Sequence, residues 1–218
     1  MERRARRSPA LRRGTSDVHA THRALRVERL TAEAFRPFGD VIEARDAGHR
    51  LTINRGRAQR FHDLAFVDAT EGGGRPVISL VRSQPSPLPI RLTLLERHVL
   101  GSQAIIALPP AAFLVVVAAA GAAPVIERIR CFLPSPGQGV NYARGTWHHP
   151  LLALNGAADF LVVDRAAPDG EVDCEEWVPG ETIWVEDLGV SAHPRAAPRR
   201  AGPGRSVAVR PRPRPAGC

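Results

Sequence analysis

The chain has 218 residues, with 30 basic and 22 acidic side chains and a formal net charge of +8. Every basic residue is an arginine, because the sequence contains no lysine. The length allows one domain or two small ones, and the longest apolar run, residues 111–123, is too short to span a bilayer. The three cysteines include no Cys-x-x-Cys pair, which excludes a disulfide framework and favours a reducing cytoplasm.

The positive charge is concentrated at the two ends of the chain. Residues 1–24 carry a net charge of +5 and residues 190–218 carry +7, so residues 25–189 carry −4. The end segments have too few large apolar side chains to offset the entropy of ordering. We therefore predict one domain over 25–189, with disordered basic extensions at 1–24 and 190–218. A nucleic-acid partner is disfavoured, because no aromatic residues are interleaved with the arginines of the tails.

The domain is expected to be mainly β. Thr31 is a plausible N-cap for a short helix that Pro37 and Gly39 end within two turns. Most of the remainder consists of short apolar runs separated by proline or glycine, a pattern that favours an antiparallel sandwich or barrel. The predicted strands are 77–81, 103–108, 113–118, 126–133 and 160–163.

Two clusters of polar residues have a characteristic spacing. Glu96 and His98 are two residues apart, so on a strand they share one face, and Gln103 follows after four residues. A glycine-framed segment, residues 137–145, then leads to His148. This arrangement resembles the two sequence motifs of the cupin superfamily, which implies a double-stranded β-helix barrel with one or two short helices. Relative to that pattern, Glu96 replaces a histidine and Gln103 replaces a glutamate.

These four residues are the candidate metal ligands. Two imidazoles, a carboxylate and an amide oxygen suit a borderline divalent ion such as nickel, iron or zinc. The same set also suits a metal-free acid/base site. It argues against an iron oxygenase, which needs two histidines, one carboxylate and open positions. Adjacent strand residues face opposite sides, so His149 is expected at the surface or in a dimer interface.

Several longer stretches resemble the ureidoglycolate lyase family. They are Leu30-Thr-Ala-Glu-Ala-Phe35, Arg60-Phe-His62-Asp63, Leu95-Glu96-Arg97-His98-x-Leu-Gly101-Ser-Gln103 and Gly139-Val-Asn141-Tyr142-x-Arg144-x-x-Trp147-His148-His149-Pro150. The resemblance covers roughly residues 27–178. It implies cleavage of (S)-ureidoglycolate to glyoxylate and urea in allantoin breakdown, by a homodimer in the cytoplasm.

The reaction requires a base, an acid and groups that hold the substrate. One carbon of ureidoglycolate bears the hydroxyl, the carboxylate and the ureido nitrogen. The base that takes the hydroxyl proton is His98 or Glu96, and the acid that protonates the leaving nitrogen is His148 or His62. The candidates for binding the substrate carboxylate are Arg82, Arg144 and Arg55. The candidates for binding the urea amide are Gln103 and Asn141.

Two other classes of protein fit the same sequence. One is a non-catalytic cupin-type domain that senses a small acid, with arginine-rich tails that contact a polyanion. The other is a different cupin enzyme, such as a metal-dependent isomerase. The sensor requires residues 1–24 and 190–218 for its function, whereas a lyase does not.

Overall fold

The computed structural model describes residues 22–44, 50–109, 111–168, 170 and 173–189. The disorder predicted for both tails therefore lies largely outside the described residues. The predicted helix is confirmed as α1 (Ala32–Phe35), whose N-cap Thr31 accepts a hydrogen bond from the Ala34 amide. None of the described helices has the length and apolar character needed to span a membrane.

The N-terminal boundary of the domain differs from the prediction by three residues. Strand β1 (His22–Ala24) pairs in parallel with β17 (Thr182–Val185), which lies near the end of the described chain. The predicted extension 1–24 was therefore too long, because its last three residues belong to the folded part. Backbone pairing between segments far apart in sequence could not be recognised from composition.

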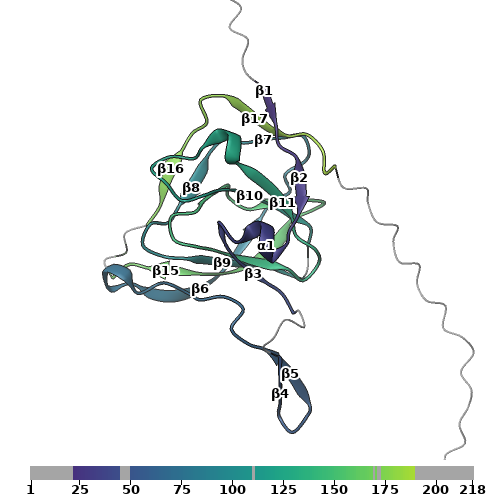
Figure 1. Ribbon diagram of the computed structural model, residues 1–218, viewed down its shortest axis with the longest axis vertical. Coiled ribbons are helices and arrows are strands. Elements are labelled where there is room, and N and C mark those ends of the chain that lie inside the picture. The colour runs from purple at the N-terminus through teal and green to yellow at the C-terminus, as the bar shows by residue number, and fades with distance from the viewer. Residues whose placement is uncertain (1–21, 45–49, 110, 169, 171–172, 190–218) are drawn as a thin grey trace, which may run out of the picture.

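Two sheets face each other across the core (Figure 1). The lower sheet has the order β3 (Gly39–Ile42), β12 (Gly139–Tyr142), β9 (Gln103–Leu108), β15 (Ala158–Ala166) and β6 (Arg75–Ser83). The upper sheet has the order β16 (Glu175–Trp177), β8 (Leu95–Arg97), β13 (Trp147–His148), β10 (Phe113–Ala118), β11 (Arg130–Leu133) and β2 (Val27–Arg29), with β14 (Leu152–Ala153) also on β10. The mainly antiparallel pairing and the scarcity of helix confirm the prediction of an all-β, cupin-like barrel.

A third layer covers only the upper sheet. It consists of β1, β17 and β7 (Ile90–Arg91), which lie at the top of Figure 1. Val115 and Val117 of β10 pack into the barrel, whereas Leu114 and Val116 pack into a second apolar cluster with residues of this layer. Burial on both faces explains why β10 is a continuous apolar run rather than an alternating one. No strand or helix of the described residues forms such a layer on the outer face of the lower sheet.

Most predicted strands are confirmed, and one is shorter than expected. Residues 103–108 and 113–118 form β9 and β10 with the predicted bounds. The run 126–133 instead begins with a 3-10 turn, η2 (Ile126–Arg128), and becomes β11 only at Arg130. The turn closes through a hydrogen bond from the Ile129 amide to the Ile126 carbonyl. The apolar composition of the run did not reveal this turn. A second such turn, η1 (Glu71–Gly73), precedes β6.

A two-stranded hairpin stands away from the barrel. Strands β4 (Arg50–Ile53) and β5 (Ala58–Phe61) pair only with each other, and Figure 1 shows the hairpin below the lower sheet. Asn54 and Arg55 form its turn with φ values of 52° and 55°. The hairpin is followed by an irregular segment, 62–70, which leads back to the barrel.

Candidate active site

A cavity of about 390 Å³ lies between the two sheets of the barrel and is open to solvent on one side. Its walls come from β6, β8, β9, β13 and β15 and from the segment after β13. The lining residues are Ser79, Val81, Ser83, Glu96, Gln103, Ile105, His148, His149, Pro150, Leu151, Val162 and Asp164. Apolar walls with a few convergent polar groups are typical of a small-molecule site.

Strand pairing brings two of the predicted residues into this cavity. Glu96 of β8 lies directly opposite His148 of β13 in an antiparallel pair, so their side chains share one face. The turn before β13 is fixed by Gly145, which has a φ of +74° and donates its amide hydrogen to the His98 carbonyl. Glycine adopts this backbone conformation without steric cost. The glycine-framed spacing in the sequence therefore positions His148.

Glu96, His98 and His148 form the centre of the site. One ligand atom from each of these side chains lies within 4.8 Å of the others. His148 is almost fully buried, stacks on the Tyr142 ring at a centroid distance of 4.3 Å, and places Nε2 3.5 Å from Glu96 Oε1. Three of the four predicted metal ligands thus converge.

The hydrogen bonds of the two histidines determine which ring nitrogen faces the centre. His148 Nδ1 lies 3.0 Å from the Thr146 carbonyl, and His98 Nδ1 contacts the Asp173 carbonyl. Because a carbonyl oxygen only accepts, each Nδ1 carries the proton and each Nε2 of the neutral ring keeps its lone pair. Metal-ligating histidines are oriented in this way in proteins.

The arrangement fits a divalent cation. His148 Nε2 is buried without a hydrogen-bond partner, although it faces the carboxylate of Glu96. A lone pair and a carboxylate repel each other unless a proton or a cation lies between them. A protonated His148 that donates to Glu96 lowers the pKa of this carboxyl, although burial opposes the effect, and a bound cation would act in the same direction. Two imidazole nitrogens and one carboxylate suit a borderline divalent ion.

Gln103, the fourth predicted ligand, lies at the edge of this centre. It lines the cavity, and its amide nitrogen is 3.1 Å from His98 Nε2, so it donates a hydrogen bond to that ring. Its oxygen is therefore not the atom presented to the centre. His98 itself lines a second cavity of about 290 Å³, which shares Asp164 with the first.

Two residues that the sequence analysis did not select also line the cavity. His149 was expected at a surface, yet it lies in the cavity wall because β13 ends at His148 and the chain turns. Its Nδ1 is 2.9 Å from the Pro150 carbonyl, which leaves a buried Nε2 without a partner and with its lone pair free. Burial lowers the pKa of His149, so the ring is neutral at pH 7.

Asp164 is the second such residue. It projects from β15 into the cavity beside Val162. Burial raises the pKa of Asp164, although His98 and Gln103 oppose this effect. The alternation of β15 could have revealed its direction, because Phe160 and Val162 are core residues in the same phase.

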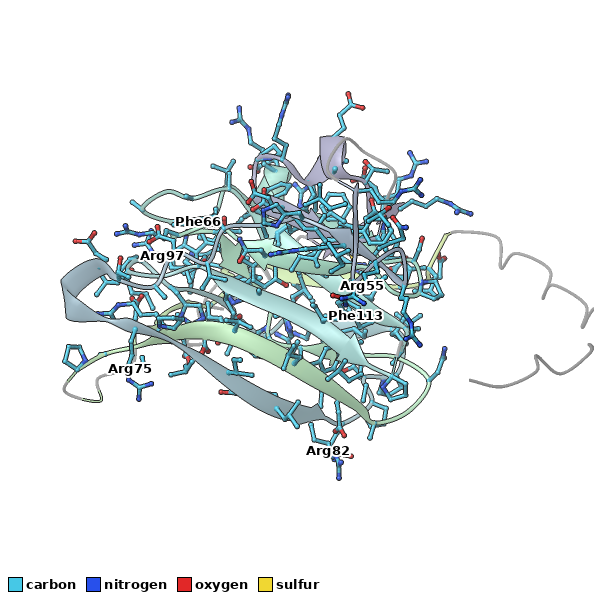
Figure 2. The ribbon with its side chains drawn as sticks, turned by 90° about the horizontal axis from the view of Figure 1, so that it is seen from below. Arg55, Phe66, Arg75, Arg82, Arg97 and Phe113 are labelled. Atoms are coloured by element: carbon cyan, nitrogen blue, oxygen red, sulfur yellow. The ribbon has the colours of Figure 1, made fainter. Side chains whose placement is uncertain are left out.

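Arg82 does not reach the site. Ser79, Val81 and Ser83 of β6 line the cavity, so Arg82 projects from the opposite face of the strand. Its guanidinium makes two hydrogen bonds to Asp159, at 2.6 and 2.8 Å, and its side chain is 71% exposed. Figure 2 shows it pointing away from the barrel. The prediction that Arg82 binds the substrate carboxylate within its own chain does not fit this position.

Arg144 and Asn141 also lie outside the cavity. Arg144 forms ion pairs with Asp68 at 3.5 Å and Glu71 at 3.4 Å, which hold the segment before β6 in place. Asn141 projects from the outer face of β12, where its amide donates to the Phe66 carbonyl at 3.1 Å. Both residues therefore anchor neighbouring segments in this chain, and neither lines its cavity.

His62 and Arg55 lie on the hairpin side of the molecule. His62 is exposed immediately after β5, and Arg55 is exposed in the hairpin turn. Neither lines the cavity of its own chain. The sequence could not show this, because the position of the hairpin relative to the barrel depends on tertiary structure.

A β-barrel that gathers two histidines and a carboxylate around an internal cavity defines a cupin-type site for a small molecule. Comparison with known proteins is more specific, because the model of the ureidoglycolate lyase family matches residues 22–186. A ureidoglycolate lyase of Burkholderia cepacia is 51% identical over 162 residues, which cover 74% of this chain and 89% of that protein. One from Burkholderia mallei is 50% identical over 165 residues (76% and 95%), and one from Pseudomonas entomophila is 46% identical over 163 residues (75% and 96%). The chain belongs to the ureidoglycolate lyase family.

Proposed function

We propose that this protein is a lyase that cleaves ureidoglycolate to glyoxylate and urea. The observation that carries the proposal is the convergence of Glu96, His98 and His148 at the wall of a cavity lined by Glu96 and His148, in a chain that belongs to this family. The cavity, of about 390 Å³, has room for a small hydroxy acid. The reaction belongs to the breakdown of purines by way of allantoin.

Glu96, His98 and His148 are the residues that would hold a divalent metal such as nickel. When bound, the metal would act as a Lewis acid toward the hydroxyl and carboxylate oxygens of the substrate. The Thr146 and Asp173 carbonyls hold the two rings with Nε2 directed inward. The protein backbone therefore holds the two rings in this orientation without the help of a metal.

Two cavity residues have the properties needed to move protons. The neutral His149 presents a lone pair on Nε2 and would take the hydroxyl proton as the C–N bond breaks. The Asp164 carboxyl, whose pKa is raised by burial, would donate a proton to the departing ureido nitrogen. These assignments replace His62, which lies outside the cavity, and leave His148 as a ligand rather than the acid.

The test is an assay of the purified protein with ureidoglycolate, in which urea and glyoxylate are measured together. Both products should form in equal amounts, above the uncatalysed rate. A chelator should remove activity, and nickel or another borderline divalent ion should restore it. Release of glyoxylate no faster than the background would overturn the proposed activity. Activity that survives removal of residues 1–21 and 190–218 would separate the lyase from a sensor that requires its tails.

We also propose that the protein is a homodimer. The upper sheet is covered by a third layer, whereas the lower sheet exposes Ile78 and Leu80 at 74% and 70%. The register places Leu161 and Val163 of β15 directly beside them on the same face. Exposed apolar patches of this kind mark protein interfaces. Light scattering should give the dimer mass, and Leu80→Asp should shift the protein toward monomer.

The cytoplasm is the proposed location of this reaction. In the part of the chain that the structure describes, Cys131 and Cys174 are both free thiols. Burial raises the pKa of Cys174 to about 11, so its thiol is protonated at neutral pH. Unpaired thiols support a reducing compartment. Fractionation of cells that produce the protein would test this location.

A further inference from the structure

The cavity lacks a cationic side chain for the anionic substrate. Among the residues that the structure describes, no arginine lines it, and the whole sequence contains no lysine. Glu96 and Asp164 place carboxyl groups in its wall instead. Arg165 lines only the neighbouring cavity, and its guanidinium donates to the Glu71 carbonyl. A divalent ion held by Glu96, His98 and His148 would contact only part of the substrate carboxylate, and a guanidinium from elsewhere would supply the bidentate partner that the wall lacks.

The hairpin β4–β5 carries arginines that have no role in their own chain. Arg55, Arg57 and Arg60 are exposed, and none of their guanidinium groups has a hydrogen-bond or ion-pair partner among the described residues. Arg55 and Arg57 lie in the turn, and Arg60 lies on β5 opposite Leu51, in a hairpin that projects away from the barrel (Figure 1). No hairpin residue lines the cavity of the same chain.

The two faces of the hairpin differ in chemistry. The register pairs Leu51 with Arg60 and Ile53 with Ala58 on one face. On the other face, Thr52 and Gln59 hydrogen-bond to each other. Leu51 and Ile53 are exposed, although an isolated two-stranded hairpin is only marginally stable in water. The apolar face is therefore expected to pack against another surface.

A second copy of the chain offers such a surface. Apart from Val125 and Val178, the exposed large apolar side chains of the described residues belong to the hairpin, to the segment after it, or to the lower sheet. They are Leu51, Ile53, Phe66, Val67, Ile78, Leu80, Val81 and Leu108, of which Val81 faces the cavity and not the outer face of the sheet. The hairpin projects on the same side as the outer face of the lower sheet (Figure 1), and Phe66 lies between them in sequence. In a two-fold dimer, each hairpin would face the lower sheet of the partner.

We propose that each active site is completed across the dimer, by arginines of the partner's β4–β5 hairpin. The apolar face of the hairpin packs on the lower sheet of the second copy beside β6, the edge strand that also lines the cavity. From there, Arg55, Arg57 and Arg60 reach the mouth of the cavity and bind the carboxylate of the substrate. This inference rests on the proposed function and on the proposed dimer.

The sharpest test uses mixed dimers. The variant R55Q/R57Q/R60Q should lose about 10- to 100-fold in kcat/KM, mainly through KM, because it lacks a charged carboxylate partner. His148→Gln should be inactive because it lacks one imidazole of the central group. A mixed dimer of the two, isolated by two different affinity tags, has one intact cavity that faces one intact hairpin. It should recover about half of the wild-type activity per dimer, because one of its two sites is complete.

The outcomes separate the alternatives. If the hairpin served its own chain, neither site of the mixed dimer would be complete, and absence of recovery would overturn the proposal. The matched control R36Q/R91Q/R128Q removes three exposed arginines of the barrel and the same charge, and it should keep wild-type activity. An equal loss in this control would also contradict the proposal, because the effect would then be one of net charge.

A second measurement does not depend on activity, so it separates the hairpin from the proposed reaction. A photo-crosslinking residue at position 55 should give covalent dimers whose peptides map to the partner's β6 or to the rim of its cavity. Crosslinks confined to a single chain, or none at all, would overturn the hairpin proposal even if the lyase activity is real. If intermolecular crosslinks form but the protein has no activity on ureidoglycolate, the hairpin contact stands and only the proposed substrate is wrong.

Discussion

His148 Nε2 lies 3.5 Å from Glu96 Oε1, whereas its Nδ1 is held by the Thr146 carbonyl. The neutral ring therefore presents a lone pair to the Glu96 carboxylate, and the His148 side chain is almost fully buried whereas that of Glu96 is 23% exposed. Such a contact is favourable only when a cation or a proton lies between the two groups. This relationship makes His148 the residue on which the site depends most.

We expect His148→Gln to lose at least about 100-fold in kcat, because the variant lacks the inward-facing imidazole of the site. Metal content, measured by mass spectrometry of the purified protein, should fall in parallel. His22→Gln is the matched control, because His22 is an exposed residue of β1. A His148→Gln variant with full activity and a native thermal melt would contradict the assignment of the site.

We expect His149→Asn to lower kcat by about 10²- to 10⁴-fold, because it removes the proposed proton acceptor. The metal content should stay near that of the wild type, since His149 is not part of the ligand group. Metal content and kcat measured on the same sample distinguish the roles of the two adjacent histidines. Parallel loss of both quantities would instead make His149 a ligand.

Asp164→Asn should stabilise the protein at neutral pH while it lowers activity. Burial raises the folded-state pKa of Asp164 above its usual value of 3.8, so the favourable protonated form is lost as the pH rises through that folded pKa. Removal of the ionisable group should therefore raise Tm at pH 7 by about 1–3 °C. The gain should vanish below about pH 4, where both states bind the proton. Thermal melts between pH 4 and pH 8 would show this trend, and a lower Tm at pH 7 would contradict it.

Gly145→Ala should destabilise the protein by about 1–2 kcal/mol, because a side chain at a φ of +74° is strained. The same change should lower kcat, since this turn positions His148. Gly180→Ala is the matched control, as a Cβ at that position would meet no atom within 4 Å. Urea unfolding measures both variants. Similar stability losses in the two proteins would exclude a special role for the Gly145 turn.

Much of the fold could be predicted from local patterns. The N-cap at Thr31 and the apolar runs that became β9 and β10 depend on neighbouring residues only, so sequence alone identified them. The run 126–133 was partly wrong, because a turn and a strand of similar composition differ only in backbone hydrogen bonding. The pairing of β1 with β17 joins the two ends of the folded part and leaves no local signal.

The residues of the candidate site also divide into those that local spacing identified and those whose position depends on tertiary structure. Glu96, His98 and His148 were selected from short spacings, and in the structure strand pairing and the Gly145 turn place Glu96 and His148, whereas His98 follows directly after β8. Arg82 and Arg144 were assigned to the substrate on chemical type, but their direction depends on the strand phase and on ion pairs with Asp159, Asp68 and Glu71. Asn141 was misplaced for a similar reason, since it projects from the outer face of β12.

The sequence by itself determined the family, the mainly β architecture and the central group of two histidines and a carboxylate. These features depend on spacings of a few residues, which a strand converts directly into geometry. Only the tertiary structure decided that His149 and Asp164 line the cavity, that no arginine of the described chain does, and that the hairpin arginines stand outside it. These properties depend on which distant segments pack together, and residue types alone do not specify that packing.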